Sequence, residues 1–184
     1  MKTYRKAGRE HTEETLRAAY AYARQHSIRT VVVASTKGDT GAAAAKLGKE
    51  HGIATIVVTH NTGFSQSGIQ EFSAKQRQRI EAAGARLYTG TLVLRGLGSA
   101  IRKKFGVSEE ELVASVLRLF SQGIKVCVEM AAMVADAGLI PMEDIVCVAG
   151  TGRGADTAAL IFPAPSNAFF DMKVREIIVK PEEF

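Results

Sequence analysis

Short runs of consecutive apolar residues alternate along this chain with stretches whose apolar residues recur every three or four positions. The first run, Thr30 to Ala34, contains three successive valines, and comparable runs lie at 54–59, 144–149 and 158–162, with shorter or more mixed ones at 86–89 and 174–179. Runs of this length that are apolar at nearly every position are typical of strands buried on both faces of a sheet. We therefore predict a strand at each of these positions.

The helical periodicity predicts helices at 12–26, 40–51, 69–83, 108–120 and 124–137. In the first, Leu16, Ala19, Tyr20 and Ala23 form an apolar stripe, and Thr12 is expected to cap the helix. Residues 90–106 contain several glycines and are expected to form a looser connection.

This alternation of strands and helices predicts an α/β fold, a three-layer α/β/α sandwich around a largely parallel sheet. A chain of 184 residues is long enough for one domain with a substantial core, so residues 1–184 are expected to form a single domain. Ligands of such folds bind at the carboxyl ends of the strands. The polar loops that follow the strands are therefore the places to look for a site.

The first strand ends in the polar segment Ser35-Thr36-Lys37-Gly38-Asp39-Thr40-Gly41, which leads into an alanine-rich helix. The unpaired N–H groups at the start of a helix, its dipole, the hydroxyls of Ser35, Thr36 and Thr40, and the cation Lys37 favour a phosphate. The spacing is not that of a Walker loop. A turn at Gly38 with a helix cap at Asp39 or Thr40 would explain the same residues without a ligand.

A second glycine-rich loop, Gly150-Thr151-Gly152-Arg153-Gly154, follows the predicted strand at 144–149. With Ala155 it matches G-x-G-x-x-A, but that fingerprint must open a helix, and only about three residues remain before the next strand. We predict a tight turn that presents N–H groups and Arg153 to an anion. The alternative is a simple strand connection in which glycines supply positive φ angles.

A third polar loop, His60 to Gly68, is expected at the same rim, where Asn61, Thr62 and Gly63 would contact the rest of the ligand. His60 is interpreted as a loop residue rather than a catalyst, because the sequence supplies no nucleophile beside it. Glu129 lies in a helix that is apolar on nearly every face. A charge there is either paired, for example with Lys125, or functional.

The bulk composition narrows the class of partner. The net charge of +5 mildly favours anionic ligands, but the cations are scattered and Trp is absent, so we expect no nucleic-acid partner. Cys127 and Cys147 stand among apolar residues and are expected to be buried free thiols rather than metal ligands. Without a signal-peptide pattern or a membrane-length apolar run, we expect a cytoplasmic protein with no membrane contact.

The segment from Val31 to Leu47, the loop from Gly150 to Gly154 and the helix that ends in Ala135-Asp136-Ala137-Gly138 resemble the carboxy-terminal α/β domain of pyruvate kinases. From about residue 12 to residue 180, the chain resembles the stand-alone proteins of this superfamily, whose function is undefined. The resemblance implies a mixed, mainly parallel sheet with an antiparallel strand near the end, and flavin mononucleotide (FMN) as the ligand. Lys37 and Asp39 depart from the kinase pattern, so its sugar bisphosphate is not carried over.

The leading hypothesis is that the chain binds a phosphorylated small molecule, FMN or a related nucleotide. It excludes pyruvate kinase catalysis, because a catalytic (β/α)₈ barrel needs about 250 residues. One alternative is a flavin-dependent or phosphate-transforming enzyme that uses His60 or Glu129. Another is a regulatory module that senses a metabolite. Assembly into a homo-oligomer is left open.

Overall fold

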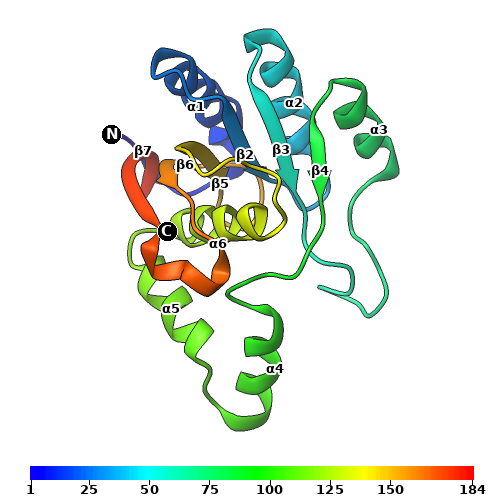
Figure 1. Cartoon of the computed structure of the whole chain (residues 1–184), viewed down its shortest axis with the longest axis vertical. Coiled ribbons are helices and arrows are strands. Elements are labelled where there is room, and N and C mark those ends of the chain that lie inside the picture. Colours follow the sequence, from blue (N-terminus) through cyan, green and yellow to red (C-terminus); the bar gives the residue numbers. More distant parts are fainter.

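The computed structural model describes residues 1–184 and contains one seven-stranded sheet with helices on both faces (Figure 1). The strands are β1 (Lys2–Lys6), β2 (Thr30–Ala34), β3 (Ala54–Val58), β4 (Arg86–Tyr88), β5 (Ile145–Ala149), β6 (Thr157–Phe162) and β7 (Lys173–Glu183). The α-helices are α1 (Thr12–Gln25), α2 (Asp39–His51), α3 (Ala74–Ala82), α4 (Gly96–Phe105), α5 (Glu109–Arg118) and α6 (Gln122–Asp136). Two 3-10 helices complete the fold, η1 (Arg9–His11) and η2 (Ser166–Asp171).

The strand order is β1-β7-β6-β5-β2-β3-β4. Every neighbouring pair is parallel except the two that involve β6, which runs antiparallel to both β5 and β7. The expected α/β sandwich with a mainly parallel, mixed sheet is therefore confirmed. Because only β6 is reversed, β1, β2, β3, β4 and β5 all end at the same edge of the sheet.

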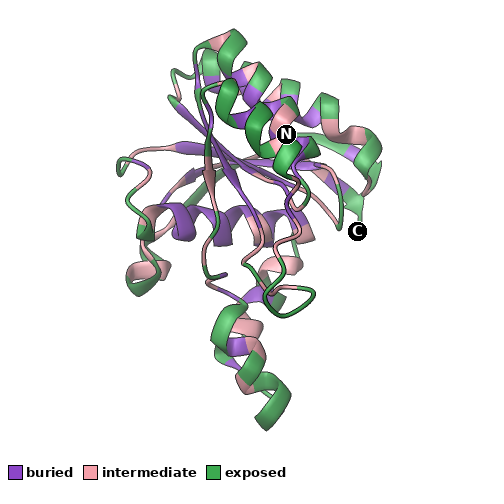
Figure 2. Cartoon of the chain, turned by 90° about the vertical axis from the view of Figure 1, so that its right-hand side faces the viewer, coloured by how far each residue is buried: buried purple, intermediate pink, exposed green.

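The valines of β2 show how this sheet builds two cores. Val31 and Val33 pack on one face, in a cluster with Leu16 and Tyr20 of α1. Val32 points to the other face, in a cluster with α6. Strand side chains alternate between faces, and both faces are covered, so nearly every position of β2 is apolar and buried (Figure 2).

The structure corrects three expectations about the elements. The N-terminal segment forms the edge strand β1, which the sequence did not indicate because four of its five residues are exposed and only Tyr4 is buried. The helix expected at 69–83 starts only at Ala74, because residues before it are held against the loop after β3; Gln70 Nε2, for example, donates to the His60 carbonyl at 3.1 Å.

The third correction concerns α4, which lies where a loose glycine-containing connection was expected. Glycine lowers helix propensity, so the pattern pointed away from a helix. Helices α4 and α5 extend away from the sandwich beyond α6 (Figures 1 and 2). No helix in the structure combines the length and the apolar character needed to cross a membrane.

Candidate functional site

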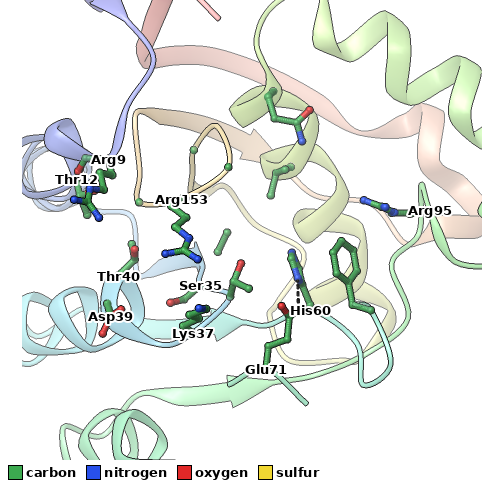
Figure 3. Close-up of a pocket in the computed structure, with 18 residues that line it drawn as sticks. Arg9, Thr12, Ser35, Lys37, Asp39, Thr40, His60, Glu71, Arg95 and Arg153 are labelled. Carbon is green, nitrogen blue, oxygen red and sulfur yellow. Dashed lines mark hydrogen bonds and ion pairs between the residues drawn. The ribbon is translucent and has the colours of Figure 1, made fainter. Parts of the chain in front are cut away.

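A cavity of about 680 Å³ opens at the edge of the sheet where the parallel strands end (Figure 3). Its walls come from the segments that follow β1, β2, β3 and β5, and from the start of α4 and of α6. The lining residues are Arg9, Thr12, Ala34, Ser35, Thr36, Lys37, Asp39, Thr40, His60, Phe64, Glu71, Arg95, Gln122, Val126, Gly150, Gly152, Arg153 and Gly154. Residues of all three polar loops therefore meet at one rim, as inferred from the sequence.

The loop after β2 is organised by Ser35. Its Oγ accepts hydrogen bonds from the N–H groups of Gly38, at 3.2 Å, and Gly41, at 3.1 Å. Ser35 therefore supplies the acceptor for two N–H groups at the start of α2. The expectation that Asp39 or Thr40 caps this helix is wrong. The Asp39 carboxylate instead accepts from Gln76 Nε2 at 2.6 Å.

Several N–H groups of this loop keep their hydrogen-bonding capacity. Those of Thr36, Lys37, Asp39 and Thr40 donate to no acceptor within the protein. Two of them belong to the first turn of α2, where the helix dipole favours a negative charge. Gly38 makes this arrangement possible, because it has a φ of 106° and its α-carbon faces Phe72 so closely that a Cβ would lie 3.0 Å from the Phe72 ring.

The buried carboxylate of Asp156 holds the glycine loop after β5. Asp156 accepts from the Thr151 N–H at 3.1 Å and from the Thr157 hydroxyl at 2.8 Å. The loop leads directly into β6 and opens no helix. It is therefore not a dinucleotide fingerprint, as the sequence indicated. The N–H groups of Gly150, Gly152 and Gly154 donate to no protein acceptor, so a second set of free donors lines the cavity.

Thr12 joins this glycine loop to the N-terminal segment. It does not cap α1 as expected; its hydroxyl donates to the Arg9 carbonyl and accepts from the Ala155 N–H at 3.0 Å. Gly154 packs directly on this segment, where a Cβ would lie 2.7 Å from Arg9 Cα. The contact fixes Arg9 beside the glycine loop.

Four cations line the cavity without a carboxylate partner. Arg9, Lys37, Arg95 and Arg153 form no ion pair, although eleven other pairs occur in the chain. Figure 3 shows the Arg153 side chain reaching from the glycine loop toward Ser35 and Lys37, with Arg95 on the opposite side, beyond His60. The two carboxylates of the lining, Asp39 and Glu71, are engaged by neighbours. The cavity therefore carries a positive potential that no protein carboxylate compensates.

His60 faces the cavity from the end of β3. Its Nδ1 lies 3.1 Å from Glu71 Oε2, and its ring stacks on Phe64 with centroids 3.7 Å apart. The Arg95 guanidinium lies over Phe64, 4.4 Å from the ring centre. His60 Nε2 makes no hydrogen bond to the protein. A carboxylate on one ring nitrogen and a free second nitrogen are what an acid–base group requires.

A side pocket of about 90 Å³ adjoins the main cavity and shares His60, Phe64 and Arg95 with it. Of its 15 lining residues seven are apolar, among them Val58, Leu92, Met130 and Met133. Lys125 and Glu129 form a buried ion pair at its base, and Glu129 also accepts from the Leu94 N–H at 2.8 Å. The interpretation of Glu129 as a paired structural charge is therefore confirmed.

The predicted site residues divide into two groups. Ser35, Thr36, Lys37, Thr40, Gly150, Gly152, Arg153 and Gly154 line the cavity. Outside the lining lie Gly38, Asn61, Thr62, Gly63 and Thr151. In the third loop the flanking residues His60 and Phe64 face the cavity in place of 61–63, because Asn61 Nδ2 turns back to donate to the Thr62 carbonyl. No three His, Cys, Asp or Glu side chains gather to hold a metal ion.

Sequence reasoning missed Arg9, Phe64, Glu71, Arg95, Gln122 and Val126. Arg9 and Arg95 matter most, because they supply half of the unpaired positive charge. Arg9 directly follows Gly8 and precedes a helix, which is a pattern that can mark an anion-binding residue. Because the edge strand β1 was not predicted, the sequence did not place Arg9 at this rim. Arg95 stood in a segment expected to be loose.

No family model matches the chain. Two solved structures that it resembles are O-ureido-L-serine synthase and a K43A mutant of that synthase with O-ureido-L-serine bound; each has a TM-score of 0.34, at 16% and 18% sequence identity respectively. The match covers 72% of this chain and spans only 40% of the synthase's length.

Proposed function

We propose that this protein binds a phosphorylated small molecule, FMN or a related nucleotide, in the cavity at the carboxyl ends of its parallel strands. The observation that carries the proposal is the meeting of four unpaired cations with free N–H groups from two separate loops around one cavity. Of the residues that carry these N–H groups, Thr40 is buried and Thr36, Gly150 and Gly154 are half-buried, and a donor shielded from water is costly without an acceptor. A phosphate supplies several acceptor oxygens and the compensating charge at once.

In the proposed complex the phosphate lies between the start of α2 and the glycine loop. Lys37 and Arg153 would neutralise it, and the free N–H groups of Thr36, Lys37, Asp39 and Thr40 would donate to its oxygens. A cavity of about 680 Å³ falls in the usual range for small-molecule sites, roughly 300–1,000 Å³. The rest of the ligand would extend through the main cavity toward His60 and Arg95.

We also propose a kinship with the stand-alone pyruvate-kinase-like domains, based on the sequence of the two loops and of the helix that ends in Ala135-Asp136-Ala137-Gly138. The assignment of FMN within the broader class of phosphorylated ligands follows from this kinship.

A second candidate function, a flavin-dependent or phosphate-transforming enzyme, is favoured by His60. Its Nδ1 is oriented by Glu71, and its free Nε2 faces the space where the ligand would lie. Such a pair can accept and return a proton at Nε2, with Glu71 stabilising the imidazolium. Bound FMN would itself supply the redox chemistry.

Two measurements test the binding proposal. Mass spectrometry of what co-purifies with the protein identifies a native ligand, which we expect to carry phosphate. Calorimetric titration with FMN and with riboflavin, which lacks the phosphate, measures the contribution of the anion. We expect riboflavin to bind at least about tenfold more weakly, since charge-assisted hydrogen bonds are worth about 1.5–3 kcal/mol. Equal affinities would contradict a phosphate site. Reduction of bound FMN by a nicotinamide cofactor, lost in a His60→Gln variant, would favour the enzyme.

A further inference from the structure

We propose that the hairpin formed by α4 and α5, residues 96–120, is a dimerisation surface that packs against the same hairpin of a second copy of this chain. The inference is independent of the ligand site. It rests on the apolar side chains that the hairpin exposes and on the distribution of its charges.

The hairpin leaves a large part of its apolar surface uncovered. Leu97 and Leu119 are 73% and 77% exposed, and the same is true to a lesser degree of Phe105, Val107, Leu112 and Val116. Within the two helices only Gly98 and Ala114 are buried. Large apolar side chains gathered in one place are unusual on the surface of a monomer and mark interaction sites.

The spacing of these side chains fits a helical partner. Leu112, Val116 and Leu119 are separated by four and three residues, so they form one stripe along α5 and its C-cap residue Leu119. On α4, Leu97 and Phe105 lie eight residues apart and share a face. Two such hairpins pair naturally as a four-helix bundle, in which these stripes become the core.

The hairpin carries both a basic and an acidic turn, so two copies of it can complement each other in charge. This selects a second copy of the chain as the partner. The last turn of α4 carries Arg102, Lys103 and Lys104, and the first turn of α5 carries Glu109, Glu110 and Glu111. Of these six, only Glu111 has an ion-pair partner, Arg118. A two-fold axis places the basic turn of one hairpin opposite the acidic turn of the other, twice in the same dimer.

The carboxylates distinguish this surface from a membrane-binding one. An anionic lipid surface selects cations beside apolar side chains, whereas Glu109 and Glu110 would be repelled by it. A second copy satisfies both signs of charge.

Sedimentation velocity and light scattering of the full-length protein test the proposal. We expect a mass twice that of the chain. Leu112→Glu or Leu119→Glu should weaken association by about 30-fold or more, because each places an unpaired charge in the centre of the interface. Phe170→Glu is the matched control: Phe170 is even more exposed, on η2 outside the hairpin, and its replacement should leave the dimer intact.

A charge-exchange experiment identifies the occupant. One variant carries Lys103→Glu and Lys104→Glu, and the other carries Glu109→Lys and Glu110→Lys. Each alone should associate more weakly than the parent, because like charges then face each other across the two-fold axis. Mixed together they should form a heterodimer, with circular dichroism confirming that both remain folded.

A monomeric parent protein would overturn the proposal, whether the true partner is another protein or none. So would a dimer that Leu112→Glu and Leu119→Glu leave unchanged, or a mixture of the two charge variants that fails to associate.

Discussion

Removing the amino group of Lys37 tests how the cavity holds an anion. In the structure this side chain is exposed, makes no hydrogen bond and forms no ion pair, so Lys37→Ala should change the free energy of unfolding by less than about 0.5 kcal/mol. Its proposed contact is with the phosphate alone. A charge-assisted contact at a partly solvated rim is worth about 1–2 kcal/mol, which corresponds to an affinity loss of about 5- to 30-fold.

The assay is calorimetric titration with FMN, paired with thermal unfolding of each variant without ligand. Lys49→Ala serves as the control, since it removes the same charge from the last turn of the same helix, away from the cavity. Its affinity for FMN should stay within about twofold of the parent. The loss in Lys37→Ala should shrink at high salt, because screening already weakens an exposed contact.

Asp39→Ala should have the opposite effect on binding. It removes a negative charge from the cavity wall, so the affinity for FMN should hold or rise. The lost hydrogen bond to Gln76 should cost up to about 1 kcal/mol of stability. If Lys37→Ala binds phosphorylated ligands as well as Lys49→Ala does, the loop after β2 is a turn and a helix start, and the reasoning about its charge fails.

Three further predictions concern the scaffold and use denaturant unfolding. Gly152→Ala should lower the free energy of unfolding by about 1–2 kcal/mol, because of its φ of 80° alone. Gly154→Ala should lower it further, because its Cβ would also lie 2.7 Å from the backbone of the segment before α1; equal costs would contradict this. Glu129→Ala should cost about 3–5 kcal/mol, since it strands the buried Lys125 charge; a cost below about 1 kcal/mol would show that the charge relaxes to solvent. Burial raises the pKa of both the Cys127 and the Cys147 thiol, so the unfolded chain loses these two protons first. The contribution of the two neutral thiols to stability is complete below the unfolded pKa, about 8.5, and falls above it by about 1.4 kcal/mol per pH unit for each thiol; Cys147→Ala should halve this decline, and an unchanged slope would refute it.

The centre of the fold could be predicted from the sequence because its strands are buried on both faces. In β2, both faces pack in apolar clusters, so the sequence shows an unbroken apolar run that favours only one kind of element. The same logic placed the polar loops at a common rim. Ser35, Lys37 and Arg153 were found for that reason.

The edge of the fold could not be predicted in the same way. Strand β1 buries only Tyr4, and its pairing with β7 joins the two ends of the chain, a contact that no local pattern encodes. Because β1 was not predicted, Arg9 could not be placed at the site. Arg95 follows a segment whose glycines weaken the helical signal, and its stacking on Phe64 arises only when two distant loops meet.

The central claim is that phosphate binds between the start of α2 and the glycine loop, and an NMR titration tests it most directly. Amide shifts of the ¹⁵N-labelled protein are followed while FMN, and separately inorganic phosphate, is added. The account predicts that both ligands produce their largest shifts at residues 36–40 and 150–154, and that FMN also shifts His60 and Phe64. Shifts centred elsewhere in the molecule, or none with either ligand, would contradict it.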